Sequence, residues 1–291
     1  MGSPELDLTR RSLMIAAASA AFAPVSWGRT AGERTFTAAS GYGVEFHHPA
    51  DELIGDLLAT ERGDPRMQAS IPHREWFSER VRREYGAWGP GPRHYPIAAA
   101  AEGKSAAWRR ERAIAVALRF VGYGYQHHHI PDWDPSAEWP WKETCAGRNG
   151  KGVDCSNFTG FVYNQGFGIR PNTAIGRQAE RLEVEVGPEG RPHRLTRVEL
   201  PEDHEGKVRA LRSGDLLFIR GKPGGEVTHV VLWVGPIGRS ATGLPLILDS
   251  HGGDVKDDEG RPIPCGVQLR PFRERSWYDR CASHAHRVFA G

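Results

Sequence analysis

The sequence has few cysteines, almost no net charge and no long apolar run in its interior. Its 291 residues include only 4 Cys, too few for a disulfide scaffold, and no C-x-x-C pair that would suggest structural zinc. The 38 Lys and Arg nearly balance the 36 Asp and Glu, so a net charge of +2 gives no reason to propose nucleic acid as a partner. Stability must come from core packing, and the length allows one domain with an extension.

The main apolar run lies at the N-terminus and indicates export. Arg10 and Arg11 precede the stretch from Ser12 to Ala23, in which ten of twelve residues are apolar. A run of this length is shorter than the ~20 residues that span a bilayer. The pattern resembles a twin-arginine signal, which is read by the twin-arginine export machinery. We therefore expect a signal peptide at 1–23, no integral membrane span and a periplasmic or secreted protein; a buried N-terminal helix is the alternative.

Helical patterns come first along the chain, and strand patterns follow. The spacing of apolar residues predicts helices at 72–85, at 107–121 and from Cys155 to Gly166 or Gly168. A Gly- and Pro-rich break after residue 85 favours a division into an extension at 24–104 and a second domain at 105–291. Alternating patterns predict five strands, at 215–219, 227–234, 246–250, 266–270 and 283–289. This order indicates an α+β fold with helices packed on an antiparallel sheet or partial barrel.

Cys155 is the strongest candidate for a nucleophile. It lies where a polar loop turns into an amphipathic helix, and the free amides of a helix N-terminus favour an anion such as a thiolate. The same amides could stabilise the oxyanion of a tetrahedral intermediate. A buried, inert cysteine is the alternative interpretation.

Two histidines are placed to serve such a thiolate. His229 begins one predicted strand and His251 ends the next, and their residue numbers centre an antiparallel hairpin on Ser240. Directly opposed side chains in such a hairpin lie about 4.5–5.5 Å apart at Cβ. We therefore expect His229 to be the general acid and base, and His251 to hold it in the correct tautomer. Each histidine taken alone fits a satisfied surface or core residue better, and only the pair in register favours the catalytic interpretation.

These motifs together resemble the NlpC-type cell-wall cysteine peptidases, a papain-like family. The matching segments are Asp154-Cys155-Ser156, the Ser213-Gly214-Asp215-Leu216 strand, the Thr228-His229-Val230 strand and Ser250-His251-Gly252, in the family's order. The resemblance covers about 185 residues from Ala107 onward. It implies a papain-like cysteine hydrolase domain at 105–291 that needs no cofactor and no metal and cuts peptidoglycan stem peptides, between D-glutamate and diaminopimelate.

The resemblance also implies substrate contacts and shows two departures. Tyr125 would lie beside the nucleophile, Asp154 would contact a free amine of the stem peptide or cap the helix, and Ser156 would line the same subsite. Asn157 stands where the family usually has glycine, and His127, His128 and His129 replace its usual residues after the tyrosine. Because consecutive side chains of an extended chain alternate in direction, we do not expect these three histidines to hold one metal.

Several points are left open by the sequence. The same catalytic centre could serve acyl transfer or another amide, or the domain could be a catalytically silent cell-wall-binding module. Trp133, Trp139 and Trp141 could stack on sugars, although a packed loop fits them better. If Cys155 stays reduced, Cys265 and Cys281 are the expected disulfide pair.

Overall fold

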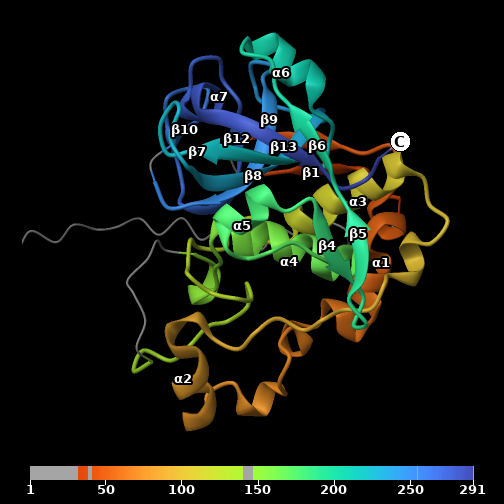
Figure 1. Ribbon diagram of the computed structural model, residues 1–291, viewed down its shortest axis with the longest axis vertical. Helices are drawn as coiled ribbons and strands as arrows, with labels where there is room; N and C mark the ends of the chain where they lie inside the picture. Colours follow the sequence, from red (N-terminus) through yellow and green to blue (C-terminus); the bar gives the residue numbers. More distant parts are fainter. Residues whose placement is uncertain (1–31, 39–40, 140–146, 254, 291) are drawn as a thin grey trace, which may run out of the picture.

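The computed structural model describes residues 32–38, 41–139, 147–253 and 255–290. The expected signal peptide at 1–23, Trp141 and Cys145 lie outside these residues. Helices and strands alternate irregularly along the chain and form an α+β fold, as expected (Figure 1). No helix among the described residues is both long enough and apolar enough to cross a membrane.

The main sheet has eight strands, with order β1-β2-β8-β7-β13-β6, while β9 pairs with β8 and β12 pairs with β9. All of these pairs are antiparallel. The strands are β1 (Thr35–Thr37), β2 (Gly43–Glu45), β6 (Thr196–Glu199), β7 (Leu216–Arg220), β8 (Val227–Arg239), β9 (Pro245–His251), β12 (Gly266–Pro271) and β13 (Ala282–Arg287). Two small sheets contain β3 (Ile169–Arg170), β4 (Glu183–Val186) and β5 (Arg191–Arg194), and β10 (Val255–Lys256) with β11 (Pro262–Ile263).

Seven α-helices lie on the two sides of the main sheet and in the extension, within the part of the chain that the structure describes. They are α1 (Ala50–Ala59), α2 (Glu79–Tyr85), α3 (Ala106–Leu118), α4 (Cys155–Phe167), α5 (Ile175–Glu180), α6 (His204–Ala210) and α7 (Trp277–Cys281). Figure 1 shows α3, α4 and α5 on one side of the sheet and α6 and α7 on the other.

Each side of the sheet has its own apolar cluster. On the α3 and α4 side, Val116 and Phe158 pack with Leu232 and Leu248 in the larger cluster. Successive side chains of a strand point to opposite faces of the sheet. Val231, the neighbour of Leu232, therefore packs on the other side with residues of the α6 and α7 layer. The strands therefore have nearly continuous apolar sequences because both of their faces are buried.

The five strands predicted from the sequence are all present, and three additional strands complete the main sheet. The helix expected at 107–121 is α3, and the one expected from Cys155 is α4, which ends at Phe167 and is capped by Gly168 in a left-handed conformation with φ 76°. The predicted helix at 72–85 is instead a 3-10 turn followed by α2. The hydroxyl of Ser78 caps α2 by accepting the Val81 amide, so the helix begins late.

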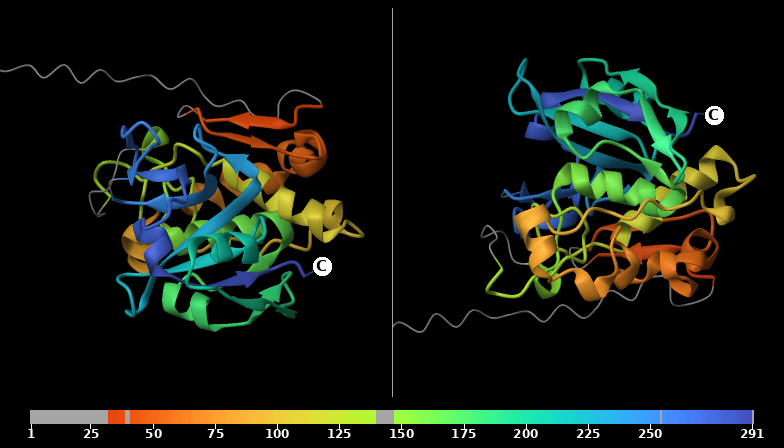
Figure 2. Two further views of the ribbon diagram at one scale, coloured as in Figure 1. Left: turned by 90° about the horizontal axis from the view of Figure 1, so that it is seen from above. Right: turned by 60° about the horizontal axis from the view of Figure 1, so that its bottom comes forward.

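The N-terminal extension contributes to the same core as the second domain. Strand β2 lies beside β8 and pairs with it (Figure 2). In this pairing Gly43 lies opposite Arg239. Helix α1 packs on α3, where the buried Arg112 binds Asp56 through two hydrogen bonds of 2.7 and 2.8 Å. The division into two domains at residue 104 remains a prediction. Residues on both sides of it belong to one apolar cluster.

The expected disulfide is absent. Cys265 and Cys281 are both free, as is Cys155. Cys281 is buried with α7 in the smaller apolar cluster, whereas the Cys265 thiol lies against the Gly252 carbonyl at 3.8 Å. The two cysteines flank β12 and β13, but these strands are not neighbours in the sheet, and this explains why the prediction was wrong.

Candidate active site

The N-terminus of α4 places Cys155 at the first position of a well-capped helix. The Asp154 carboxylate accepts the Asn157 backbone amide at 2.9 Å and the Asn157 side-chain amide at 2.9 and 3.0 Å. This is an N-cap, the structural alternative that the sequence left open for Asp154. The amide of Cys155 has no acceptor within the helix, because the first turn of any helix leaves its N–H groups free. It is therefore available to an oxyanion.

His229 comes from the beginning of β8 and lies against Cys155. The two side chains are near enough that Cys155 raises the pKa of His229. Cys155 and His229 are each 6% exposed, so solvent reaches the pair only at its edge. The structure thus brings together the nucleophile and the base expected from the sequence, from segments more than seventy residues apart.

Asp249 of β9 is the third member of this cluster and was missed in the sequence. Its carboxylate Oδ2 lies 3.0 Å from His229 Nε2. Because Nε2 faces Asp249, the remaining ring nitrogen, Nδ1, is the one available to Cys155. The arrangement is therefore a Cys-His-Asp series in which the carboxylate fixes the tautomer of the imidazole.

Asp249 is itself held by two further donors. Arg270 Nε of β12 donates to Oδ1 at 2.6 Å, and the Tyr278 hydroxyl of α7 donates to Oδ2 at 2.8 Å. Both Asp249 and Arg270 have side chains with no exposed surface. Burial raises the pKa of the Asp249 carboxyl, but the charge of Arg270 and the hydrogen bond from His229 outweigh burial and bring that pKa well below its usual range. Asp249 is therefore a carboxylate at all working pH values.

The environment of His229 favours its protonated form. Burial lowers its pKa, while Cys155 and Asp249, through charge and hydrogen bonds, raise it more strongly, to about 10 from 6.5. A histidine of this kind is an imidazolium when its partner is a thiolate. The imidazole beside Cys155 is therefore backed by a carboxylate, and its protonated form is favoured.

His251 does not have the orienting role that the sequence suggested. The predicted hairpin register is correct, since Leu232 lies opposite Leu248 and Trp233 opposite Ile247. The His251 ring lies edge-on to the His229 ring, with centroids 5.2 Å apart. Its Nδ1, however, accepts the Gly253 amide at 2.9 Å, and the hydrogen bond to His229 comes from Asp249. Asp249 replaces His251 because it lies diagonally across the hairpin on the same face, within reach of the imidazole.

The expected substrate contacts are near the site but already have internal partners. The Ser156 hydroxyl donates to the Thr173 carbonyl at 2.6 Å, which ties α4 to the segment before α5. The Tyr125 ring lies over Gly252, where an added Cβ would be 3.1 Å from the ring. Asp154 also faces His127 Nδ1 at 3.5 Å. A role for these three residues in substrate binding remains a proposal.

The side chains of the three consecutive histidines lie in different environments. His127 faces Asp154, and His128 is buried, which lowers its pKa to about 4. His129 stacks on Trp88 with centroids 5.5 Å apart and donates to the Gly89 carbonyl at 3.0 Å. No group of three or more metal-ligating side chains occurs among the described residues.

The tryptophans of the same loop form a packed layer. Trp133 has no exposed surface and stacks on Phe77 with centroids 5.0 Å apart. Trp139, 5% exposed, meets Trp133 edge-on at 5.2 Å. These two rings are core residues under the loop, in agreement with the packed-loop interpretation.

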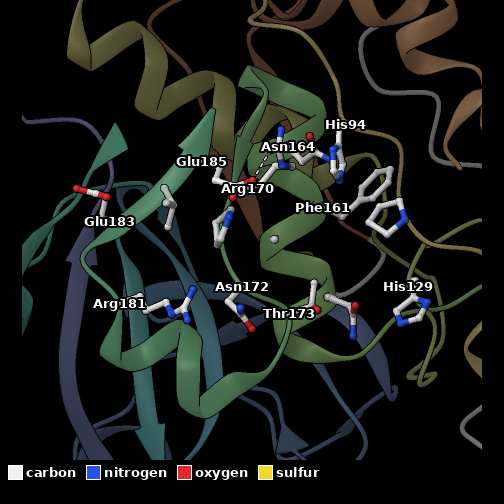
Figure 3. A pocket seen from close by; sticks show the side chains of 15 residues that line it. His94, His129, Phe161, Asn164, Arg170, Asn172, Thr173, Arg181, Glu183 and Glu185 are labelled. Carbon is white, nitrogen blue, oxygen red and sulfur yellow. Dashed lines mark hydrogen bonds and ion pairs between the residues drawn. The ribbon is translucent and has the colours of Figure 1, made fainter. Parts of the chain in front are cut away.

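A cavity of ≈ 290 Å³ lies along α4, on the side of the helix that carries Asn157 and Phe161 (Figure 3). We call it the α4 pocket. It is also lined by Arg170 and Asn172 after α4, by Arg181 after α5, and by His94 of the extension. Cys155 does not line it, but Asn157 is two residues from Cys155 on the same helix.

Part of this chain matches a known protein family. Residues 143–283 match the sequence model of the NlpC/P60 family, and Cys155, His229 and Asp249 lie within the matched range. No curated protein is detectably similar in sequence.

Solved structures with some likeness include an NlpC/P60 family protein from Bacillus cereus and the NlpC/p60 domain of the peptidoglycan hydrolase SagA. The first is 20% identical with a TM-score of 0.37, and the match covers 62% of this chain and 40% of that one. The second is 20% identical with a TM-score of 0.33, and the match covers 60% of this chain and 96% of that one. The chain thus spans less than half of the Bacillus cereus protein.

Proposed function

We propose, from the NlpC/P60 family domain at residues 143–283, that this protein is an exported cysteine peptidase that hydrolyses an amide bond in peptidoglycan stem peptides. The observation that carries the proposal is that Cys155, at the N-terminus of α4, lies beside His229, whose Nε2 is hydrogen-bonded to the buried Asp249 carboxylate. A thiolate beside an imidazolium is the nucleophile of acyl-transfer enzymes of this type.

The reaction begins when the Cys155 thiolate attacks the carbonyl carbon of the scissile amide. A C–S bond forms, and the carbonyl electrons move to oxygen, where the free amide of Cys155 at the helix N-terminus stabilises the oxyanion. As the tetrahedral intermediate collapses, the C–N bond breaks and His229 gives its Nδ1 proton to the leaving amine. The products of this half are a thioester on Cys155 and a released amine.

The second half of the reaction uses water. Neutral His229 takes a proton from a water molecule, whose oxygen attacks the thioester carbonyl. The C–S bond then breaks, the acid product leaves, and the thiolate–imidazolium pair is restored. Asp249 keeps the imidazole oriented through both halves without taking up a proton.

The finer assignments belong to this proposal. The scissile bond would be the one between D-glutamate and diaminopimelate, as the family resemblance implies. Asp154, Ser156 and Tyr125 would line the groove beside Cys155, and His251 would contribute to its wall. The export route would be the twin-arginine pathway, giving a periplasmic or secreted enzyme.

Digestion of defined muropeptides tests the proposal. Purified protein should release two fragments from a stem peptide, identified by mass spectrometry, and a Cys155→Ala variant should release none. Full cleavage by Cys155→Ala would refute the mechanism. Added amine acceptors separate hydrolysis from acyl transfer, because a transferase would yield the amide of the acceptor instead of the free acid.

A further inference from the structure

We propose that the α4 pocket binds a carboxylate of the peptide substrate, through Arg181 and Asn172. This inference rests on the proposed function and specifies a substrate feature, a free carboxylate away from the scissile bond. The α4 pocket is separate from the catalytic cluster, since none of Cys155, His229 and Asp249 lines it.

Arg181 supplies the charge. It follows α5 and is exposed, and its guanidinium makes no hydrogen bond or ion pair to another residue of the described chain. Arg170, the other arginine of the α4 pocket, is already bound by the Glu185 carboxylate and the Gly187 carbonyl. Arg170 therefore forms part of the wall, while Arg181 is free to bind an incoming anion.

Asn172 supplies a neutral donor with a fixed orientation. Its Oδ1 accepts the Ala174 amide at 2.8 Å, so its Nδ2 group is turned away from this turn. Figure 3 shows the Arg181 side chain extending toward Asn172. A guanidinium and an amide donor facing one space fit the oxygens of a carboxylate.

The acidic side chains of the α4 pocket do not cancel this preference. Glu185 is neutralised by Arg170. Glu183 is exposed, and in Figure 3 its carboxylate points away from Arg181 and Asn172. The local charge around the free donors is therefore positive, and this favours an anion over the ammonium group of a peptide.

The α4 pocket is also fixed in position relative to the nucleophile. The Thr173 carbonyl, next to Asn172, accepts the hydroxyl of Ser156, which directly follows Cys155. Asn157, which replaces the glycine usual at this position in the family, has its side chain held by Asp154 and forms part of the wall. A carboxylate bound here would anchor the peptide across the first turn of α4 and so limit its approach to Cys155.

Binding of one stem peptide in two forms tests the inference. The full chain carrying Cys155→Ser, which cannot turn over, is titrated calorimetrically with the peptide as free acid and as carboxamide. We expect the acid to bind about tenfold more tightly, and Arg181→Gln to abolish the difference. Arg177→Gln, an exposed arginine on α5 outside the α4 pocket, is the matched control and should keep the full difference.

The possible failures can be told apart. Equal binding of acid and carboxamide by the Arg181-containing protein, or an unchanged preference in Arg181→Gln, overturns the carboxylate site. If wild-type protein cleaves no muropeptide while the Arg181-dependent preference persists, the proposed function fails and the carboxylate site stands. If it cleaves muropeptides but neither peptide form binds, the site is overturned and the proposed function stands.

Discussion

The catalytic cluster and the α4 pocket flank the same helix. They differ in how many hydrogen bonds their polar side chains already make within the protein. Asp249 is fully buried and accepts hydrogen bonds from three side chains, whereas Arg181 is exposed and its guanidinium has no partner among the described residues. Preorganised charge in a site with little water is the most effective way to stabilise a transition state. Free donors at the surface suit reversible recognition, because they lose little when a ligand leaves. The comparison therefore assigns chemistry to one side and recognition to the other.

The largest expected effect is loss of the nucleophile. In Cys155→Ser the alkoxide is not formed at neutral pH, so peptide hydrolysis should fall by ~10⁴-fold or more. Rates are measured by chromatography of muropeptide fragments. Binding of the free-acid peptide should remain within a factor of about two of Cys155→Ala. A Cys155→Ser variant that also loses peptide binding would contradict the assignment of catalysis and recognition to two separate regions.

Removal of the carboxylate should be next in size. In Asp249→Asn the tautomer of His229 is no longer fixed, and kcat should drop by about 10²–10⁴-fold. The same change leaves Arg270 buried without its counter-charge, so the free energy of unfolding in urea should fall by about 3 kcal/mol.

His251→Gln is the matched control for Asp249→Asn, because His251 lies next to His229 without a hydrogen bond to it in the structure. We expect it to keep activity within about tenfold of wild type. A larger loss in His251→Gln than in Asp249→Asn would restore the role that the sequence assigned to His251.

Stability at alkaline pH should report the raised pKa of His229. A histidine whose pKa is about 10 when folded and 6.5 when unfolded adds stability that is complete below pH 6.5 and is lost as the pH rises toward 10. Wild-type protein should therefore lose thermal stability more steeply between pH 7 and 10 than His229→Gln does. Parallel curves of Tm against pH would contradict the raised pKa of His229.

The smallest effect should come from Tyr278→Phe. It removes one of the two donors to Asp249 Oδ2, while His229 and Arg270 still bind the carboxylate. We expect a loss of about 1 kcal/mol in unfolding free energy and less than tenfold in kcat. An effect as large as that of Asp249→Asn would show that the tyrosine takes a direct part in the chemistry.

The hairpin shows how far sequence reasoning reached into the site. Periodicity and turn residues predicted β8 and β9 and their register, which the pair Leu232 and Leu248 confirms. The third partner of the series was predicted wrongly because direct opposition was assumed. Arg270 of β12 and Tyr278 of α7 hold Asp249 diagonally against His229, and neither residue is near it in sequence.

The extension illustrates a second limit. Strands β1 and β2 have three residues each, too few to show an alternating pattern, and they became strands only by pairing with each other and with β8. Propensity over so short a window is weak compared with tertiary pairing.

The sequence by itself determined where α3, α4 and the five principal strands lie and that a cysteine begins a helix, because periodicity and capping act over a few neighbouring residues. Tertiary structure alone decided which buried carboxylate faces His229 and which arginine of the α4 pocket stays free. Those choices depend on hydrogen bonds between residues tens of positions apart, and such bonds form only once the sheet and its helices have packed.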